Sequence, residues 1–122
     1  MLFSESCILV GDNTHVGLVR CIRILGGSNN SYGTVGEFVV VAVQHRWKKR
    51  RLINKVIYLA LVIMVKKQKR RMQGYYIRCR QNRVFMISEQ GVLIGTRFLS
   101  SVCLEVRLRG LAKMLSKIKA YI

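Results

Sequence analysis

The sequence contains no proline and only five acidic residues in 122. Without proline, glycine and asparagine must supply the tight turns between its elements. The acids form no close pair, and the sequence has neither a Ser-His-Asp pattern nor a phosphate-binding loop. We therefore expect a protein that is not an enzyme.

Closely spaced metal ligands are also missing. No two cysteines form a CxxC pair, and neither histidine has a second ligand nearby in the sequence. Zinc sites usually contain such close pairs, so we expect no metal and no cofactor. Nothing indicates export, and we expect buried free thiols rather than disulfides. The cysteines are Cys7, Cys21, Cys79 and Cys103.

Long hydrophobic runs are absent as well. The longest apolar run, Val56 to Val65, has ten residues, whereas a helix that spans a bilayer needs roughly 20. A short apolar run flanked by basic residues is typical of a buried strand. The first residues show neither a secretory signal nor an arginine-rich transit peptide. We expect no membrane span.

Positive charge is what the chain has in excess. Its formal net charge is +17, and 14 of its 22 lysines and arginines lie between Glu37 and Glu89, a stretch without any acid. The densest runs are Arg46–Arg51 (RWKKRR) and Lys66–Arg71 (KKQKRR). Ordinary surfaces mix both signs, so this excess favours a polyanionic partner over merely solvated loops. A nucleic acid is the first choice because its binding releases condensed counterions, and an anionic membrane surface is the alternative.

The apolar pattern predicts a small all-β domain, either a barrel or a sandwich. Turn residues separate short runs that are alternating or rich in β-branched residues. We predict strands over residues 7–10, 19–25, 38–43, 55–65, 75–80 and 83–87, with the two basic runs in loops. In the second strand Val19, Cys21 and Ile24 face inward and Arg20 and Arg23 outward, while the register at Ile22 stays open.

The C-terminal segment changes period. Its apolar residues recur at intervals of three and four, with basic residues on the opposite side, which predicts an amphipathic helix. The apolar positions are Leu108, Leu111, Ala112, Leu115 and Ile118. The length suits one domain. We therefore expect a single domain over residues 1–122, with β-structure to about residue 100 and a helical segment over about 101–122.

Residues 11–37 contain, in order, Asp-Asn-Thr, a cysteine-containing apolar run, Gly-Gly-Ser, a tyrosine and Val-Gly-Glu. This pattern resembles the large-subunit ribosomal protein L-fourteen family. The family pattern DNSGA, a cysteine-containing strand, GGS, an aromatic residue and VGD is matched without a gap. The matching segments are Asp12–Thr14, Cys21–Leu25, Gly26–Ser28, Tyr32 and Val35–Glu37. Further matches are Ile77-Arg78, Asn82, Ile94–Arg97 and Glu105–Arg107. The chain departs from the family at Thr14–Val16, at residues 99–102, where a proline is usual, and at Gln73-Gly74.

This resemblance implies a five-stranded β-barrel with short C-terminal α-helices that serves as a structural part of the large ribosomal subunit. The expected partners are large-subunit rRNA, neighbouring large-subunit proteins, small-subunit rRNA across the subunit interface, and a ribosome-silencing factor that docks on Thr96 and Arg97. The basic residues expected to contact rRNA are Arg20, Arg23, Arg46, Lys48, Lys49, Arg50, Arg51, Lys66, Lys67, Lys69, Arg70, Arg71 and Arg78.

Four aromatic residues next to basic or flexible segments could stack on an unpaired base or could simply pack within the fold. They are Tyr32, Trp47, Tyr75 and Tyr76. Compartment is predicted from composition. The divergent loops, the absence of proline and the high charge are typical of a product of a mitochondrial genome, so we expect a mitochondrial ribosome rather than a bacterial or plastid one. The alternative function is a basic amphipathic protein on a membrane surface.

Overall fold

The computed structural model describes residues 1–26, 32–47, 56–108, 116, 118 and 120–122. Several predicted features lie outside these residues. They are most of the glycine- and asparagine-rich segment at 27–31, the basic residues Lys48 to Arg51, and most of the predicted C-terminal helix.

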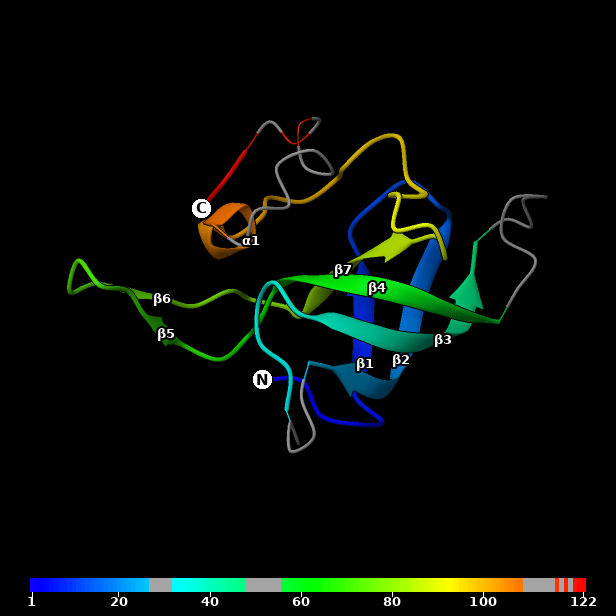
Figure 1. Cartoon of the computed structure of the whole chain (residues 1–122), viewed down its shortest axis with the longest axis horizontal. Coiled ribbons are helices and arrows are strands. Elements are labelled where there is room, and N and C mark those ends of the chain that lie inside the picture. The colour runs from blue at the N-terminus through cyan, green and yellow to red at the C-terminus, as the bar shows by residue number, and fades with distance from the viewer. Residues whose placement is uncertain (27–31, 48–55, 109–115, 117, 119) are drawn as a thin grey trace.

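Five strands close into a β-barrel in the order β1-β2-β3-β4-β7 (Figure 1). Neighbouring strands pair antiparallel, except that β1 and β7 pair parallel and close the barrel. The barrel strands are β1 (Cys7–Val10), β2 (Val16–Leu25), β3 (Phe38–Arg46), β4 (Ile57–Met64) and β7 (Arg83–Ile87). The prediction of a mainly β protein built on a five-stranded barrel is confirmed.

Strand β4 explains the longest apolar run in the sequence. Ala60, Leu61, Val62 and Ile63 are all fully buried. Since consecutive residues of a strand point to opposite faces, both faces of β4 must be covered. The chain after β7 returns across the barrel here: the Phe98 ring lies 4.6 Å from that of Phe85, centroid to centroid, and the Cys103 N–H donates to the Ile63 carbonyl at 3.2 Å. The apolar run is therefore core.

A β-bulge resolves the register that the sequence left open in β2. The pairing of β2 with β3 shifts between Cys21 and Arg23, and such an extra residue redirects the side chains that follow it. Cys21 and Ile24 are buried on either side of the shift, whereas Ile22 is exposed. Arg20 and Arg23 point outward, as predicted.

A two-stranded arm projects away from the barrel between β4 and β7 (Figure 1). It pairs β5 (Lys69–Arg70) with β6 (Tyr76–Ile77) antiparallel. We name residues 66–78 the arm. The second basic run was predicted as a loop and instead supplies β5, while only two residues of the strand predicted over 75–80 are extended as a strand. Gly74, with a φ of 92°, forms the turn at the tip.

The C-terminal part contains one short helix among the described residues, α1 (Leu104–Leu108). It packs Val106 inward, whereas Leu108, which was predicted on the apolar face, is exposed. Ile118 is buried, as predicted. Cys21, Cys79 and Cys103 are buried free thiols, but Cys7 is exposed, because the alternation of β1 gives the core position to Ile8.

Within the described part of the chain, no helix is both long enough and apolar enough to cross a bilayer.

Candidate nucleic-acid interface

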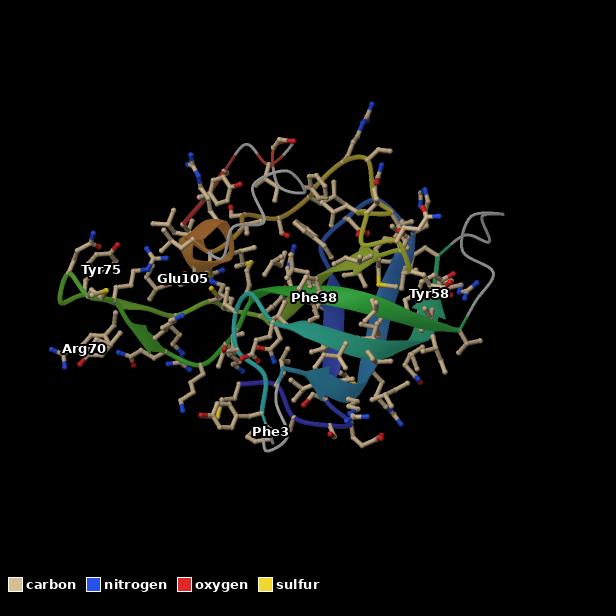
Figure 2. The ribbon with its side chains drawn as sticks, viewed as in Figure 1. Phe3, Phe38, Tyr58, Arg70, Tyr75 and Glu105 are labelled. Atoms are coloured by element: carbon tan, nitrogen blue, oxygen red, sulfur yellow. The ribbon has the colours of Figure 1, made fainter. Side chains whose placement is uncertain are left out.

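The arm carries a dense group of exposed cations. The outgoing side of the arm has four exposed cations, which are Lys66, Lys67, Lys69 and Arg70. The returning side adds Arg78, which is also exposed. Figure 2 shows Arg70 and Tyr75 far from the barrel, toward the outer end of the arm. Lysine and arginine side chains held out on a protrusion can reach the phosphates of a structured RNA without reading its sequence.

Asn82 fixes the start of the arm. Its side-chain oxygen accepts a hydrogen bond from the Lys66 N–H at 2.7 Å, and its carbonyl accepts one from the Leu9 N–H at 3.2 Å. Asn82 lies just before β7, so it connects the point where the chain leaves the barrel to the point where it returns.

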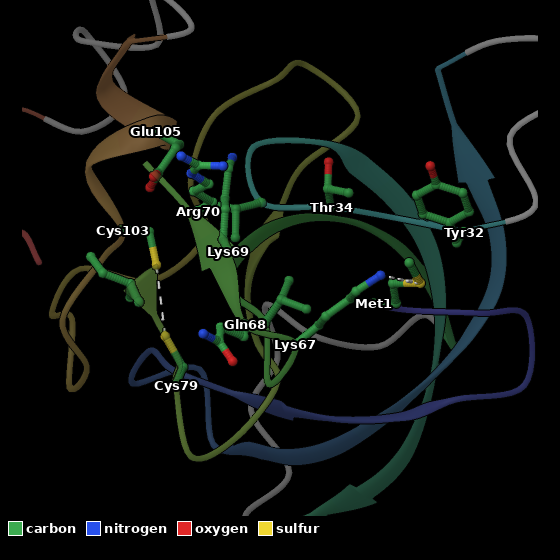
Figure 3. Close-up of a pocket in the computed structure, with 13 residues that line it drawn as sticks. Met1, Tyr32, Thr34, Lys67, Gln68, Lys69, Arg70, Cys79, Cys103 and Glu105 are labelled. Carbon is green, nitrogen blue, oxygen red and sulfur yellow. Dashed lines mark hydrogen bonds between the residues drawn. The ribbon is translucent and has the colours of Figure 1, made fainter. Parts of the chain in front are cut away.

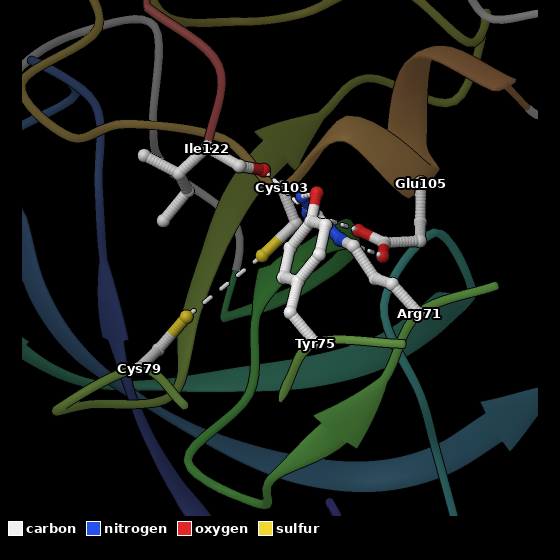
Figure 4. A network of polar contacts seen from close by, with 6 residues as sticks. All are labelled: Arg71, Tyr75, Cys79, Cys103, Glu105 and Ile122. Atoms are coloured by element: carbon white, nitrogen blue, oxygen red, sulfur yellow. Dashed lines mark hydrogen bonds and ion pairs between the residues drawn. The ribbon is translucent and has the colours of Figure 1, made fainter. Parts of the chain in front are cut away.

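Arg71 has a different environment from its basic neighbours. Its Nε and Nη2 donate to the two carboxylate oxygens of Glu105 at 2.9 and 3.2 Å, and Nη2 also donates to the Ile122 carbonyl at 2.6 Å. Its Nη1 donates to the Tyr75 hydroxyl at 3.0 Å (Figure 4). The Arg71 side chain is only 10% exposed. The structure therefore gives Arg71 a structural role, and its contact with rRNA stays a prediction.

The charges of this pair are stabilised mutually. Hydrogen bonds from Arg71 to Glu105 and Tyr75 raise the pKa of the guanidinium. Partial burial of the Glu105 carboxyl opposes its ionisation, but hydrogen bonds from Arg71, a backbone N–H and nearby positive charge together outweigh burial, so its pKa is lowered. A bidentate pair of this kind is a strong, directional contact. It connects the arm to α1.

Two buried thiols lie beside this pair. The Cys79 and Cys103 sulfur atoms are 3.8 Å apart, and neither cysteine is in a disulfide. Burial, together with the neighbouring Cys79, raises the pKa of Cys103 to about 12. A thiol with so high a pKa is protonated and unreactive near neutral pH. Together with Cys21, these residues bear out the prediction of buried structural thiols.

The Asp12-Asn13 turn has a structural role. Asp12 is buried, and its carboxylate accepts hydrogen bonds from the Thr14 N–H at 3.1 Å and the Met86 N–H at 3.0 Å. Burial raises the pKa of Asp12, and these hydrogen bonds, with one from the Thr14 hydroxyl, oppose that rise. One carboxylate therefore holds the turn and β7 together.

Asn13 holds the Gly95–Arg97 segment. Its side-chain oxygen accepts from the Thr96 N–H at 2.9 Å and the Arg97 N–H at 3.2 Å, and its side-chain nitrogen donates to the Thr96 hydroxyl at 2.9 Å. The Thr96 and Arg97 residues themselves are exposed. Two blocks more than 80 residues apart in sequence thus form one surface, which the spacing of the motifs alone did not predict.

The other predicted RNA-contacting residues are dispersed. Arg20 and Arg23 lie exposed on β2, and Arg20 makes a 3.5 Å ion pair with the exposed Glu5, which contributes little to stability. Arg46 is half-buried at the end of β3. Lys48, Lys49, Arg50 and Arg51 lie outside the described residues.

The four aromatic candidates are not core residues. Each is exposed: Tyr32, Trp47, Tyr75 and Tyr76. Tyr75 packs beneath Arg71, whose Cζ lies 5.5 Å from the ring centroid, and Trp47 lies over Gly17, where an added Cβ would overlap the indole. Both therefore make local contacts, while Tyr32 borders a pocket at the base of the arm.

Sequence reasoning missed the Arg71–Glu105 pair. The two residues are 34 positions apart. Arg71 is the last residue of the basic run Lys66–Arg71, and nothing in the sequence distinguishes it from the other cations of that run. The one signal in the sequence was the rarity of acids: an acid in so basic a chain is expected to have a structural role.

The family model described as Ribosomal protein L14p/L23e matches residues 1–122.

Proposed function

The chain belongs to the Ribosomal protein L14p/L23e family, and we propose that it anchors rRNA in the large ribosomal subunit chiefly through its arm. The family is one of structural ribosomal proteins rather than enzymes, and its members bind rRNA within the large subunit. What carries the proposal for the arm is its group of exposed cations, Lys66, Lys67, Lys69 and Arg70, on a ribbon braced against α1.

The bracing matters because a pre-ordered arm loses less conformational entropy when it binds. Lysine and arginine side chains can then sample several phosphates from a fixed backbone. Arg20, Arg23, Arg46 and Arg78 form further contacts in this proposal, as does the basic run Lys48–Arg51.

The test is the salt dependence of binding to a large-subunit rRNA transcript. Replacing Lys66, Lys67, Lys69 and Arg70 by alanine removes four phosphate contacts. The slope of log K against log salt should then fall by about 3, at roughly 0.7–0.9 per contact. The measurement is filter binding or fluorescence anisotropy over a series of salt concentrations.

A matched control removes four charges elsewhere. Replacing Arg109, Lys113, Lys117 and Lys119 by alanine lowers the net charge equally without changing any residue of the arm, so the slope should change much less. An equal fall in the salt-dependence slope of both variants would contradict the assignment of rRNA binding to the arm. If the control instead abolished binding to anionic vesicles while the rRNA slope stayed unchanged in both variants, the membrane-surface alternative would hold.

We further propose that Thr96 and Arg97 lie on a surface at the subunit interface, near small-subunit rRNA, and that a ribosome-silencing factor docks there. Support comes from the exposure of both residues and from the rigid hold of Asn13 on the backbone beneath them. A rigid backbone presents its exposed side chains in one geometry, as a docking site requires.

For this surface, Arg97→Ala should weaken binding of the silencing factor at least tenfold while the protein still sediments with large subunits. Removing one well-placed arginine from an interface commonly has an effect of this size. Failure to enter large subunits would make Arg97 an assembly residue, and unchanged binding of the factor would refute docking there.

Mitochondrial location remains our proposal, since the family establishes the ribosome and not its compartment. It is supported by the absence of proline and by the departures from the family at residues 14–16, 73–74 and 99–102. Sedimentation of the chain with mitochondrial large subunits, after a salt wash of purified organelles, tests it; co-sedimentation only with bacterial or plastid subunits contradicts it.

A further inference from the structure

A pocket of about 330 Å³ opens at the base of the arm. One side is formed by the segment before β3, with Tyr32 and Thr34, and the other by the first residues of the arm (Figure 3). Its volume lies within the range of about 300–1,000 Å³ that small ligands occupy in proteins. The pocket is therefore large enough for a single small group and too small for a folded element.

The lining of the pocket is largely apolar. Val35 and Val65 are buried within it, and Ile77 contributes from β6. Tyr32, at its edge, is 44% exposed, so this residue is accessible to a planar group. A heteroaromatic ring suits such a lining, because it gains both from burial and from stacking on an aromatic face.

The charge at the pocket is positive. Lys67, Lys69 and Arg70 all contribute to its walls. The Lys67 ammonium reaches across toward Met1, 3.6 Å from its sulfur (Figure 3). The one carboxylate in the lining, Glu105, is bonded to Arg71 through both of its oxygens. An anionic group at the entrance would therefore meet cations with little competition.

Polar groups suited to a base edge are present as well. Gln68 and Thr34 line the pocket, and an amide or a hydroxyl can both donate and accept hydrogen bonds. An unpaired nucleotide combines a planar ring, hydrogen-bonding edges and a phosphate. An acidic peptide offers the charge without a ring to fill the apolar part.

We infer that this pocket receives one unpaired nucleotide of rRNA, with its base against Tyr32 and its phosphate between Lys67 and Lys69. This inference rests on the proposed rRNA binding and names the RNA element that the base of the arm recognises. Proteins that read single-stranded RNA commonly hold splayed-out bases on aromatic side chains in this way.

The test uses the full chain and two RNA hairpins that differ only in one unpaired nucleotide. That nucleotide is 2-aminopurine, whose fluorescence falls when its ring stacks. The hairpin with the bulge should bind about tenfold more tightly than the fully paired one, since one base stacked on an aromatic side chain gives roughly this preference or more. Its fluorescence should drop on binding.

Three variants locate the effect. Tyr32→Ala should lose most of the preference for the bulge, and Ile77→Trp should block the pocket and abolish the fluorescence change. Tyr76→Ala is the matched control, because Tyr76 neighbours Ile77 and is exposed but does not line the pocket. It should behave as the wild type.

Equal affinity of the wild-type protein for both hairpins, with the salt dependence of binding intact, would overturn the pocket while leaving rRNA binding by the arm in place. Loss of salt-dependent binding to both hairpins would instead overturn the proposed function. Displacement of the bulged hairpin by an acidic peptide but not by a short single-stranded RNA would assign the pocket to a protein partner and refute the inference.

Discussion

Asp12 joins two parts of the barrel that are 74 residues apart. The position of its side chain also explains why the first residue of the Gly-Thr-Arg block, Gly95, is a glycine. The carboxylate is buried and accepts the Met86 N–H. A Cβ on Gly95 would come within 2.7 Å of the Asp12 Cβ and 2.9 Å of its Cγ. Glycine at this position therefore leaves room for the carboxylate.

Gly95→Ala should lower the free energy of unfolding by about 1–3 kcal/mol, as overpacking of a tight site does. The control is Gly33→Ala, where the nearest atoms would lie 3.5 Å from the new Cβ, an ordinary contact. That variant should be neutral, or stabilising by up to about 1 kcal/mol, because alanine lowers the conformational entropy of the unfolded chain. Urea denaturation measures both, and equal losses would show that Asp12 has room to move.

The composition of residues 11–14 (GDNT) is typical of a turn, but it does not identify the partners of Asp12 and Asn13. A short side chain in a turn commonly bonds backbone groups within a few residues, so the contact with Thr14 could be expected. The contacts with Met86, Thr96 and Arg97 depend on the barrel closing in one register, which no local pattern contains.

At the scale of elements, the arm and α1 are held together by the Arg71–Glu105 pair. The pKa of Glu105 is lowered in the folded protein from its ordinary value of about 4.5. The stabilisation is therefore fully present above about pH 4.5, and it is lost as pH falls through the lower folded-state value.

Glu105→Gln should cost about 1.5–3 kcal/mol at neutral pH, the range for hydrogen bonds to charged groups. The difference from the wild type should shrink as pH falls below 4.5, because the carboxyl is protonated first in the unfolded chain and then, at its lower pKa, in the folded protein. Unfolding free energies across pH measure it. Arg71→Lys should also destabilise, since an ammonium cannot form the bidentate contact.

Glu5→Gln is the control for this pH dependence. It removes an acid whose side chain is 74% exposed from the 3.5 Å pair with Arg20. Such surface pairs contribute little, so stability should hardly change at any pH. A pH-independent loss in Glu105→Gln would mean that packing, rather than charge, holds α1 to the arm.

The elements differ in how far sequence could predict them. The strands β1, β3, β4 and β7 were predicted because runs of apolar and β-branched residues must be buried. The arm strands are two residues each and carry mostly charged or exposed side chains. Alternation placed β6 within the strand predicted over 75–80, whereas β5 lies in a basic run that was predicted as a loop. Their positions are set by the turn at Gly74 and by Arg71.

At the scale of the whole molecule, the net charge of +17 governs the behaviour of the free protein. Repulsion among unneutralised cations destabilises the compact state. Added salt shortens the range of this repulsion to about 10 Å at 0.1 M.

We expect the free protein to unfold and aggregate at low salt and to be rescued by large-subunit rRNA. Thermal melting with light scattering at rising salt, with and without the transcript, measures this. A poly-anion without structure, such as heparin, is the control: it should rescue solubility less well than rRNA at equal charge. Full solubility of the RNA-free protein at every salt concentration would contradict the expectation.

The overall architecture could be predicted because the family motifs fall on the barrel and the C-terminal segment. The charge distribution indicated a polyanion but not which cations are available to it. Arg71 shows why: two adjacent arginines, Arg70 and Arg71, look alike in sequence, yet one faces solvent and the other is bonded to Glu105.

The parallel pairing of β1 with β7 has a consequence for the order of folding. β1 ends at Val10 and its parallel partner begins at Arg83. The barrel therefore cannot close during synthesis until most of the chain has been made. Contacts of such long sequence separation slow folding, and an open barrel exposes unpaired strand edges. We therefore expect the nascent chain to need protection, by chaperone or by rRNA, until residue 87 has left the ribosome that makes it.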